Sequence, residues 1–127
     1  MPAQHSFNYA IIRVVPKVER QEFINAGVIL FCRTLDYLDI KIDYELKRLN
    51  LLFPDANLKI VKSHLKSLET VCSGGPVAGY FGELSKSERF NWLAAPSSAI
   101  IQASPVHSGV SDAPEKALEA LFHLLIV

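Results

Sequence analysis

The sequence predicts an α+β domain: a mainly antiparallel sheet of about four strands, with helices packed on one face. The predicted elements follow the order strand, strand, strand, helix, helix, strand, helix, which is typical of this class. The second and third strands are separated by a connection short enough for a hairpin. With 127 residues, half of them hydrophobic, the chain can build one core. We therefore expect residues 1–127 to form a single domain.

The first third of the chain contains three predicted strands. Residues 7–15 are rich in aromatic and β-branched side chains, which favour strands. Residues 25–33 are apolar on both alternating faces at their centre, which indicates a central strand. Residues 38–42 alternate between apolar and polar side chains, so we expect Asp39 and Lys41 to lie on a solvent-exposed face.

Helical patterns dominate the remainder. Asp43 can cap a short helix, and Asp55 or Asn57 can begin a longer one. The longer helix has one apolar stripe, made by Leu58, Val61, Leu65, Leu68 and Val71. Residues 73–83 are typical of a loop, and residues 99–103 could extend the sheet. Residues 112–115 resemble a capping box at the start of a terminal helix.

The composition argues against nucleic-acid binding, membrane insertion and secretion. The 13 basic and 13 acidic residues balance, which gives no global signal for binding nucleic acid or anionic membrane. The longest apolar run, residues 26–32, is far shorter than the roughly 20 residues of a membrane span. Arg13 interrupts the N-terminal apolar stretch, which argues against a secretory signal. We expect a cytoplasmic protein that does not bind a membrane.

No metal or cofactor is expected from the sequence. Cys32 and Cys72 are far apart, so buried free thiols are favoured over a redox pair or a zinc site. The histidines are scattered over different elements, and no paired CxxC or HExxH motif is present.

A first group of candidate site residues surrounds the second strand. Arg13 lies on an apolar strand face, where a lone charge would be costly, so we expect Glu22 beside it. Asn25 begins the next strand. A salt-bridge network that fixes strand register is favoured over a catalytic or ligand-binding group.

Two further features could carry function. Ser104, His107 and Ser108 could surround a reaction centre, but no nucleophile elbow accompanies them, and His107 is better explained as a turn or interface residue. Trp92 and Phe90 could form a stacking or partner-anchoring surface if exposed. Core packing of these two rings is favoured, with neighbouring Arg89 exposed as an ion-pair partner.

Four segments together resemble a known family. They are FNYAIIRVVP (residues 7–16), VERQEFINAGVILF (18–31), ERFNWLAAP (88–96) and SPVHSG (104–109). In combination they resemble the bacterial domain of unknown function family 3037, over nearly the whole chain. The resemblance implies no activity and assigns no role to its matching positions, Arg13, Glu22, Asn25 and His107. Members of the family are loosely associated with neighbouring genes for kinase-like proteins, so the resemblance implies a protein partner.

Two main hypotheses follow, and minor ones remain open beside them. The leading hypothesis is a non-catalytic protein-interaction or accessory domain, with a kinase-like protein as candidate partner and an exposed apolar or aromatic patch. The alternative is a small hydrolase or nucleotide-processing enzyme, in which Arg13 binds an anion and Glu22 or His107 acts as acid or base. It requires these residues and Asn25 to share a cleft. Pairing of two copies through a strand edge also remains open, and nucleic-acid binding is the weakest possibility, resting on Arg48, Lys59, Lys62 and Lys66.

Overall fold

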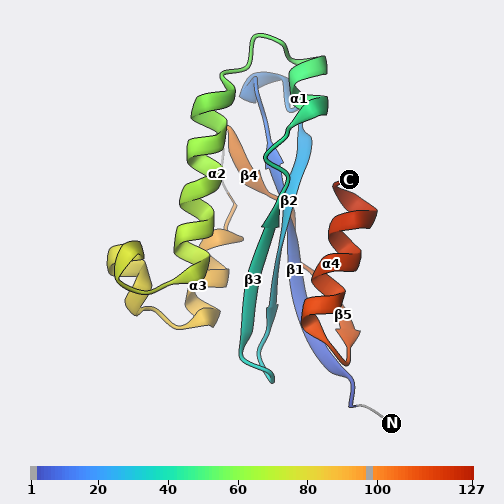
Figure 1. Ribbon diagram of the computed structural model, residues 1–127, viewed down its shortest axis with the longest axis vertical. Helices are drawn as coiled ribbons and strands as arrows, with labels where there is room; N and C mark the ends of the chain where they lie inside the picture. The colour runs from blue at the N-terminus through green and yellow to red at the C-terminus, as the bar shows by residue number, and fades with distance from the viewer. Residues whose placement is uncertain (1–2, 97–98) are drawn as a thin grey trace.

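The computed structural model describes residues 3–96 and 99–127, which form a central sheet between layers of helices (Figure 1). In chain order the elements are β1 (His5–Val14), the 3-10 turn η1 (Val18–Arg20), β2 (Ile24–Cys32), β3 (Tyr37–Ile42), α1 (Lys47–Leu52), α2 (Leu58–Ser73), the 3-10 segment η2 (Pro76–Glu83), α3 (Lys86–Leu93), β4 (Ile101–Ala103), β5 (His107–Ser111) and α4 (Pro114–Leu125).

The described residues form a five-stranded, fully antiparallel sheet. Strands β3, β2 and β1 lie side by side in that order. The second edge of β1 is shared, because β5 pairs with its residues 5–9 and β4 pairs with its residues 12–14. The predicted α+β class and antiparallel sheet are confirmed. The additional strand, β5, was not predicted.

The helices cover both faces of this sheet, and not one face as expected. Helices α2 and α3 lie on one side and α4 lies on the other (Figure 1). Ile29 and Phe31 of β2 belong to the core beneath α2 and α3, whereas Val28 and Leu30 belong to the core beneath α4. The reason for the correction is that alternate β2 side chains are all apolar, so each face needs its own cover. The side of β3 that carries Lys41, expected to be open, accordingly faces α4.

A bulge in β2 adjusts its pairing with β1. Ile12 lies opposite Gly27 and Arg13 lies opposite Asn25, so Ala26 is the extra residue. Gly27 also lies against β3, because a Cβ atom added to it would be 2.7 Å from the carbonyl oxygen of Lys41. Close backbone approach and a neighbouring bulge therefore explain this glycine in a strand.

Local capping explains where the helices begin. Asn57 caps α2 by accepting a hydrogen bond from the backbone N–H of Ile60, as predicted. Helix α3 begins with a reciprocal capping box between Ser85 and Glu88. The predicted capping box of α4 is wrong, because the helix begins after Ala113 without a side-chain cap, and Pro114 occupies its first turn.

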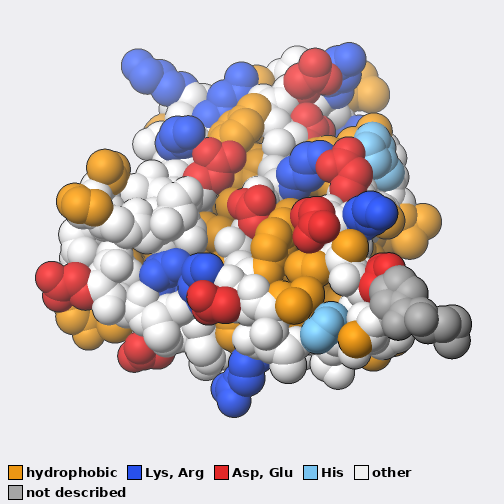
Figure 2. Space-filling view, turned by 60° about the horizontal axis from the view of Figure 1, so that its bottom comes forward, with side chains coloured by type: hydrophobic (Ala, Val, Ile, Leu, Met, Phe, Trp, Pro, Cys, Tyr) orange, Lys and Arg blue, Asp and Glu red, His pale blue; other side chains and the backbone are white. Residues whose placement is uncertain are grey.

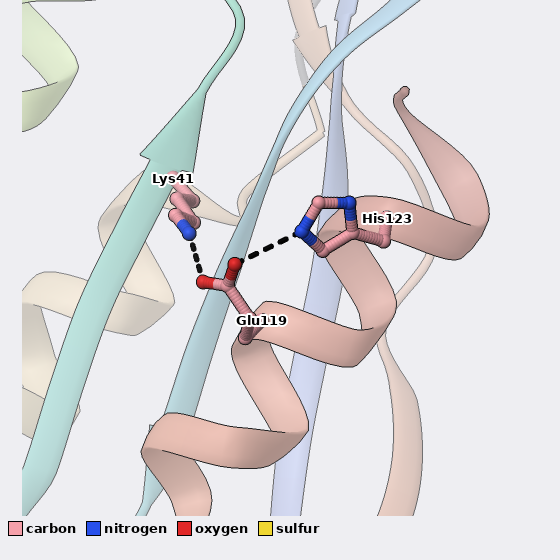
Figure 3. A network of polar contacts seen from close by, with 3 residues as sticks. All are labelled: Lys41, Glu119 and His123. Carbon is pink, nitrogen blue, oxygen red and sulfur yellow. Dashed lines mark hydrogen bonds and ion pairs between the residues drawn. The ribbon is translucent and has the colours of Figure 1, made fainter.

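Polar contacts hold α4 against the sheet (Figure 3). Lys41 Nζ of β3 donates a hydrogen bond to Glu119 Oε2, and His123 Nε2 lies 3.0 Å from Glu119 Oε1. At the far end of the helix, Arg48 of α1 donates to the carbonyl oxygen of Ile126. This cation satisfies a terminal carbonyl and opposes the negative end of the helix dipole.

The close approach at Gly27 predicts a destabilised Gly27→Ala variant. Because the added methyl group would meet the β3 backbone, we expect the free energy of unfolding to fall by about 2 kcal/mol. Urea denaturation measures this change. Ser6→Ala, at an exposed position of β1, is the control, and equal stability of the two variants would contradict the proposed clash.

The contacts of Glu119 predict a specific pH dependence. Hydrogen bonds from Lys41 and then His123 lower the pKa of Glu119 below its ordinary value of 4.5. A carboxyl group with a lowered folded-state pKa stabilises the fold above its unfolded pKa and loses this contribution as the pH falls through the folded pKa. We expect Glu119→Gln to lower the urea midpoint at neutral pH, by an amount that begins to shrink as the pH falls below 4.5 and is lost once the pH passes the lowered folded-state pKa. Glu19→Gln is the control, and a difference that grows in acid would refute the assignment.

Candidate functional site

The residues predicted to form a site are only partly brought together. Arg13 and Asn25 are cross-strand neighbours on β1 and β2. His107 lies opposite Tyr9, with the two rings 5.4 Å apart. Tyr9 is four residues before Arg13, which corresponds to about 13 Å along a strand at about 3.3 Å per residue. Glu22 lies between η1 and β2 and forms its ion pair with Arg20.

The expected Arg13–Glu22 ion pair is replaced by a different contact. The guanidinium carbon of Arg13 lies 4.1 Å from the centroid of the Phe23 ring, in cation–π geometry. Within the described chain, the buried Nε of Arg13 and the buried Oδ1 of Asn25 have no hydrogen-bond partner. On the other side of Arg13, Gln102 of β4 completes a polar row across three strands. The unpaired polar atoms of Arg13 and Asn25 can interact with a polar group. Glu22 does not fill this role, because it is paired with Arg20.

The Ser104 hydroxyl stabilises the backbone and is not placed as a nucleophile. Its hydroxyl is buried, accepts a hydrogen bond from the backbone N–H of Ile11 at 2.8 Å and donates to the carbonyl of Pro105 at 2.9 Å. These bonds lie where the chain passes from β4 to β5 along β1. The hydroxyl therefore satisfies a strand N–H that this irregular crossing would leave unpaired.

The side chains of α3 are arranged differently from the expectation. Phe90 is in the core as expected, but Trp92 is 50% exposed. Arg89, expected to be exposed, is only 7% exposed. Its Nη1 donates to the carbonyl of Leu84 at 2.6 Å, and its guanidinium lies 3.0 Å from the position that a Cβ on Gly74 would take. Arg89, Phe90 and Leu93 form the buried side of α3, and at 100° per residue Trp92 lies beside this stripe and next to exposed Glu88, which leaves its ring half exposed.

Trp92 belongs to an aromatic patch, which consists of Tyr80, Phe81 and Trp92. The rings of Phe81 and Trp92 are 4.4 Å apart, and those of Tyr80 and Phe81 are 5.7 Å apart in an edge-to-face arrangement. Tyr80 is 73% exposed, whereas Phe81 is partly buried against the core. Sequence reasoning found Trp92 but missed its η2 neighbours, because residues 73–83 were predicted as a loop without a packing partner.

Comparison with known proteins now adds the family. A family model described as "Protein of unknown function (DUF3037)" matches residues 9–126. The chain belongs to this family. The match confirms the resemblance inferred from the sequence, and the family description gives no activity. No curated protein and no solved structure matches the chain.

The DUF3037 chain provides few groups for metal or redox chemistry in its described part. Both cysteines are free and buried, and burial raises the pKa of Cys72 to about 12. A thiol with so high a pKa is a poor nucleophile at neutral pH. No cluster of three or more His, Cys, Asp or Glu side chains able to hold a metal occurs among the described residues.

Surface charge in the DUF3037 chain is mixed. Figure 2 shows acidic and basic side chains interspersed over one face, with hydrophobic side chains between them. On α2, Lys66 is paired with Glu69 at 3.0 Å, which reduces the basic character of the face proposed for nucleic acid. None of the helices described in residues 3–96 and 99–127 is both long and apolar enough to span a membrane.

The role of Ser104 in this DUF3037 chain can be tested by Ser104→Ala. Because Ile11 would keep a buried N–H without an acceptor, we expect the variant to lose about 1–3 kcal/mol of unfolding free energy. Urea denaturation provides the measurement. Ser6→Ala removes an exposed hydroxyl from β1 and is the control. Unchanged stability of Ser104→Ala would show that the bond to Ile11 is dispensable.

Proposed function

We propose that this protein is a non-catalytic protein-interaction or accessory domain, with a kinase-like protein as the candidate partner. The observation that supports this function is the exposed aromatic patch of Tyr80, Phe81 and Trp92. Tryptophan and tyrosine are the residues most enriched among those that dominate binding energy at protein interfaces. The cytoplasmic location expected from the sequence stays a prediction.

The construction of the patch suits recognition. Phe81 packs against the core, and its ring contacts the rings of both Tyr80 and Trp92. Rings that are already arranged before binding reduce the conformational entropy lost when a partner binds. The η2 segment, which carries Tyr80 and Phe81, has positive φ at Gly79 and at Gly75, the residue that precedes it. Covering the rings with a partner would remove apolar surface from water, which is favourable.

The alternative enzyme receives less support from the geometry. Glu22 is paired with Arg20, Arg13 lies over Phe23, and His107 lies against Tyr9. A general acid or base must come within hydrogen-bond reach of the reacting group, together with the residue that binds the substrate. No contact among the described residues links Glu22 or His107 to Arg13, so we retain the interaction domain as the proposed function.

Removing the exposed rings should weaken partner binding without unfolding the domain. We expect a Tyr80→Ala, Trp92→Ala double variant to bind a kinase-like protein from a neighbouring gene at least about tenfold more weakly than the unmodified chain. Isothermal titration calorimetry measures the affinity. Val110→Ala, at an exposed position on β5, is the control and should bind normally.

The outcomes separate the two parts of this proposal. If the unmodified chain does not bind the kinase-like protein, that partner is wrong, and affinity capture from the native cell then tests for another one. A partner captured equally well by the double variant, with its fold confirmed by circular dichroism, would remove the aromatic patch from the interface.

A further inference from the structure

A pocket lies between α3 and one end of the sheet, on the face covered by α2 and α3. Its volume is about 290 Å³. Its polar lining comes from three elements: Ser6 and Asn8 of β1, Arg33 just after β2, and Ser87 and Asn91 of α3. Phe31 and Phe90, whose rings stack 5.7 Å apart, provide an apolar wall. It is distinct from the polar row of Arg13 and from the aromatic patch.

Simple periodicity brings these side chains together. Ser6 and Asn8 are two residues apart on β1 and therefore point to the same face. Arg33 follows Phe31 by two residues and extends the same face of β2 beyond the core. Ser87 and Asn91 are separated by four residues, so they lie on one side of α3. On the side of the sheet that faces α2 and α3, the side chains of β1 and β2 thus change from apolar to polar at this end of the sheet.

The electrostatics of the pocket favour an anion. Arg33 is the only charged residue among those described in its lining. Asp36, in the turn after Arg33, is held by Lys86, whose Nζ lies 2.5 Å from its carbonyl oxygen and 3.3 Å from Oδ2. Within the described chain, no carboxylate lies at ion-pair distance from Arg33.

The neutral side chains add hydrogen-bond donors. Asn8 Oδ1 accepts a hydrogen bond from the Ser108 hydroxyl at 3.0 Å, so the amide nitrogen of Asn8 is left to donate. Ser87 and Asn91 bring a hydroxyl and a second amide to the other wall. A planar guanidinium with nearby amide and hydroxyl donors matches the several acceptor oxygens of a carboxylate or phosphate.

We propose that this pocket binds the oxyanion of a small organic molecule, a carboxylate or a phosphate ester. Arg33 pairs with the anion, Asn8, Ser87 and Asn91 donate hydrogen bonds to it, and the apolar part of the ligand lies against Phe31 and Phe90. The size of the pocket is at the lower end of the range of small-molecule sites. This activity goes beyond the proposed interaction with a protein.

Titration of the full chain, followed by ¹H–¹⁵N NMR, tests the proposal. The probes are phenyl phosphate, benzoate and inorganic phosphate, with neutral phenol as the matched control ligand. We expect saturable shifts for phenyl phosphate or benzoate at the backbone amides of Ser87 and Asn91 and at Arg33 Nε–H. Inorganic phosphate should bind more weakly because it makes no contact with the phenyl rings, and phenol should not saturate. The tighter of the two organic anions identifies the preferred oxyanion.

Two substitutions complete the experiment. Arg33→Gln should weaken binding of the organic anion at least about tenfold, because it removes the cation that the described lining supplies. Arg20→Gln makes the same change of charge at a remote exposed arginine and should leave the affinity unchanged. Arg33 is exposed, so its variant should keep the wild-type melting temperature. The proposal is overturned if no anion gives saturable shifts, if the shifts lie elsewhere, or if Arg33→Gln binds as well as the unmodified chain.

Discussion

Strand β2 is buried on both of its faces, and the arrangement of the helices depends on this constraint. Its residues 26–32 are all buried, with alternate side chains entering two separate cores. An antiparallel sheet can leave one face in water, but only if the side chains on that face are polar. Here a single layer of helices would leave Val28 and Leu30 exposed. Helix α4 therefore has to return to the face opposite α2 and α3.

The polar features of the protein occur where this helical cover ends. On the face of α2 and α3, β1 changes from the buried positions Ala10 and Ile12 to the polar positions Ser6 and Asn8. On the face of α4, β1 changes from Phe7 and Tyr9 to Arg13. A strand end that leaves the core can carry charge, because water reaches it there. Both polar regions thus follow from the side-chain pattern of β1. Ser6 and Asn8 lie near the start of the strand on one face, and Arg13 lies near its end on the other face.

Sequence patterns predicted the parts of the fold that are determined locally. Strands β1 to β3 and helices α2 and α4 have clear periodicity. The capping box of α3 was also present, in the Ser85-to-Glu88 spacing, but was not used. Strand β5 could not be recognised, since His107–Ser111 has little strand-forming character and depends on β1; Gly109 lies where an added Cβ would be 2.5 Å from the Phe7 ring. The hydrogen bond of Ser104 to Ile11 joins residues 93 positions apart, which no local pattern can give.

Helix α3 connects the two candidate binding surfaces, and a buried cation helps to hold it. Arg89 lies against Gly74, the residue that ends α2, where the helix dipole favours positive charge. The same guanidinium bonds to Leu84, just before α3 begins. A side chain at position 74 would meet this guanidinium, so the glycine serves both the positive φ of the helix end and the approach of α3. With one side of α3 held in this way, Ser87 and Asn91 line the pocket, and Trp92 forms part of the aromatic patch.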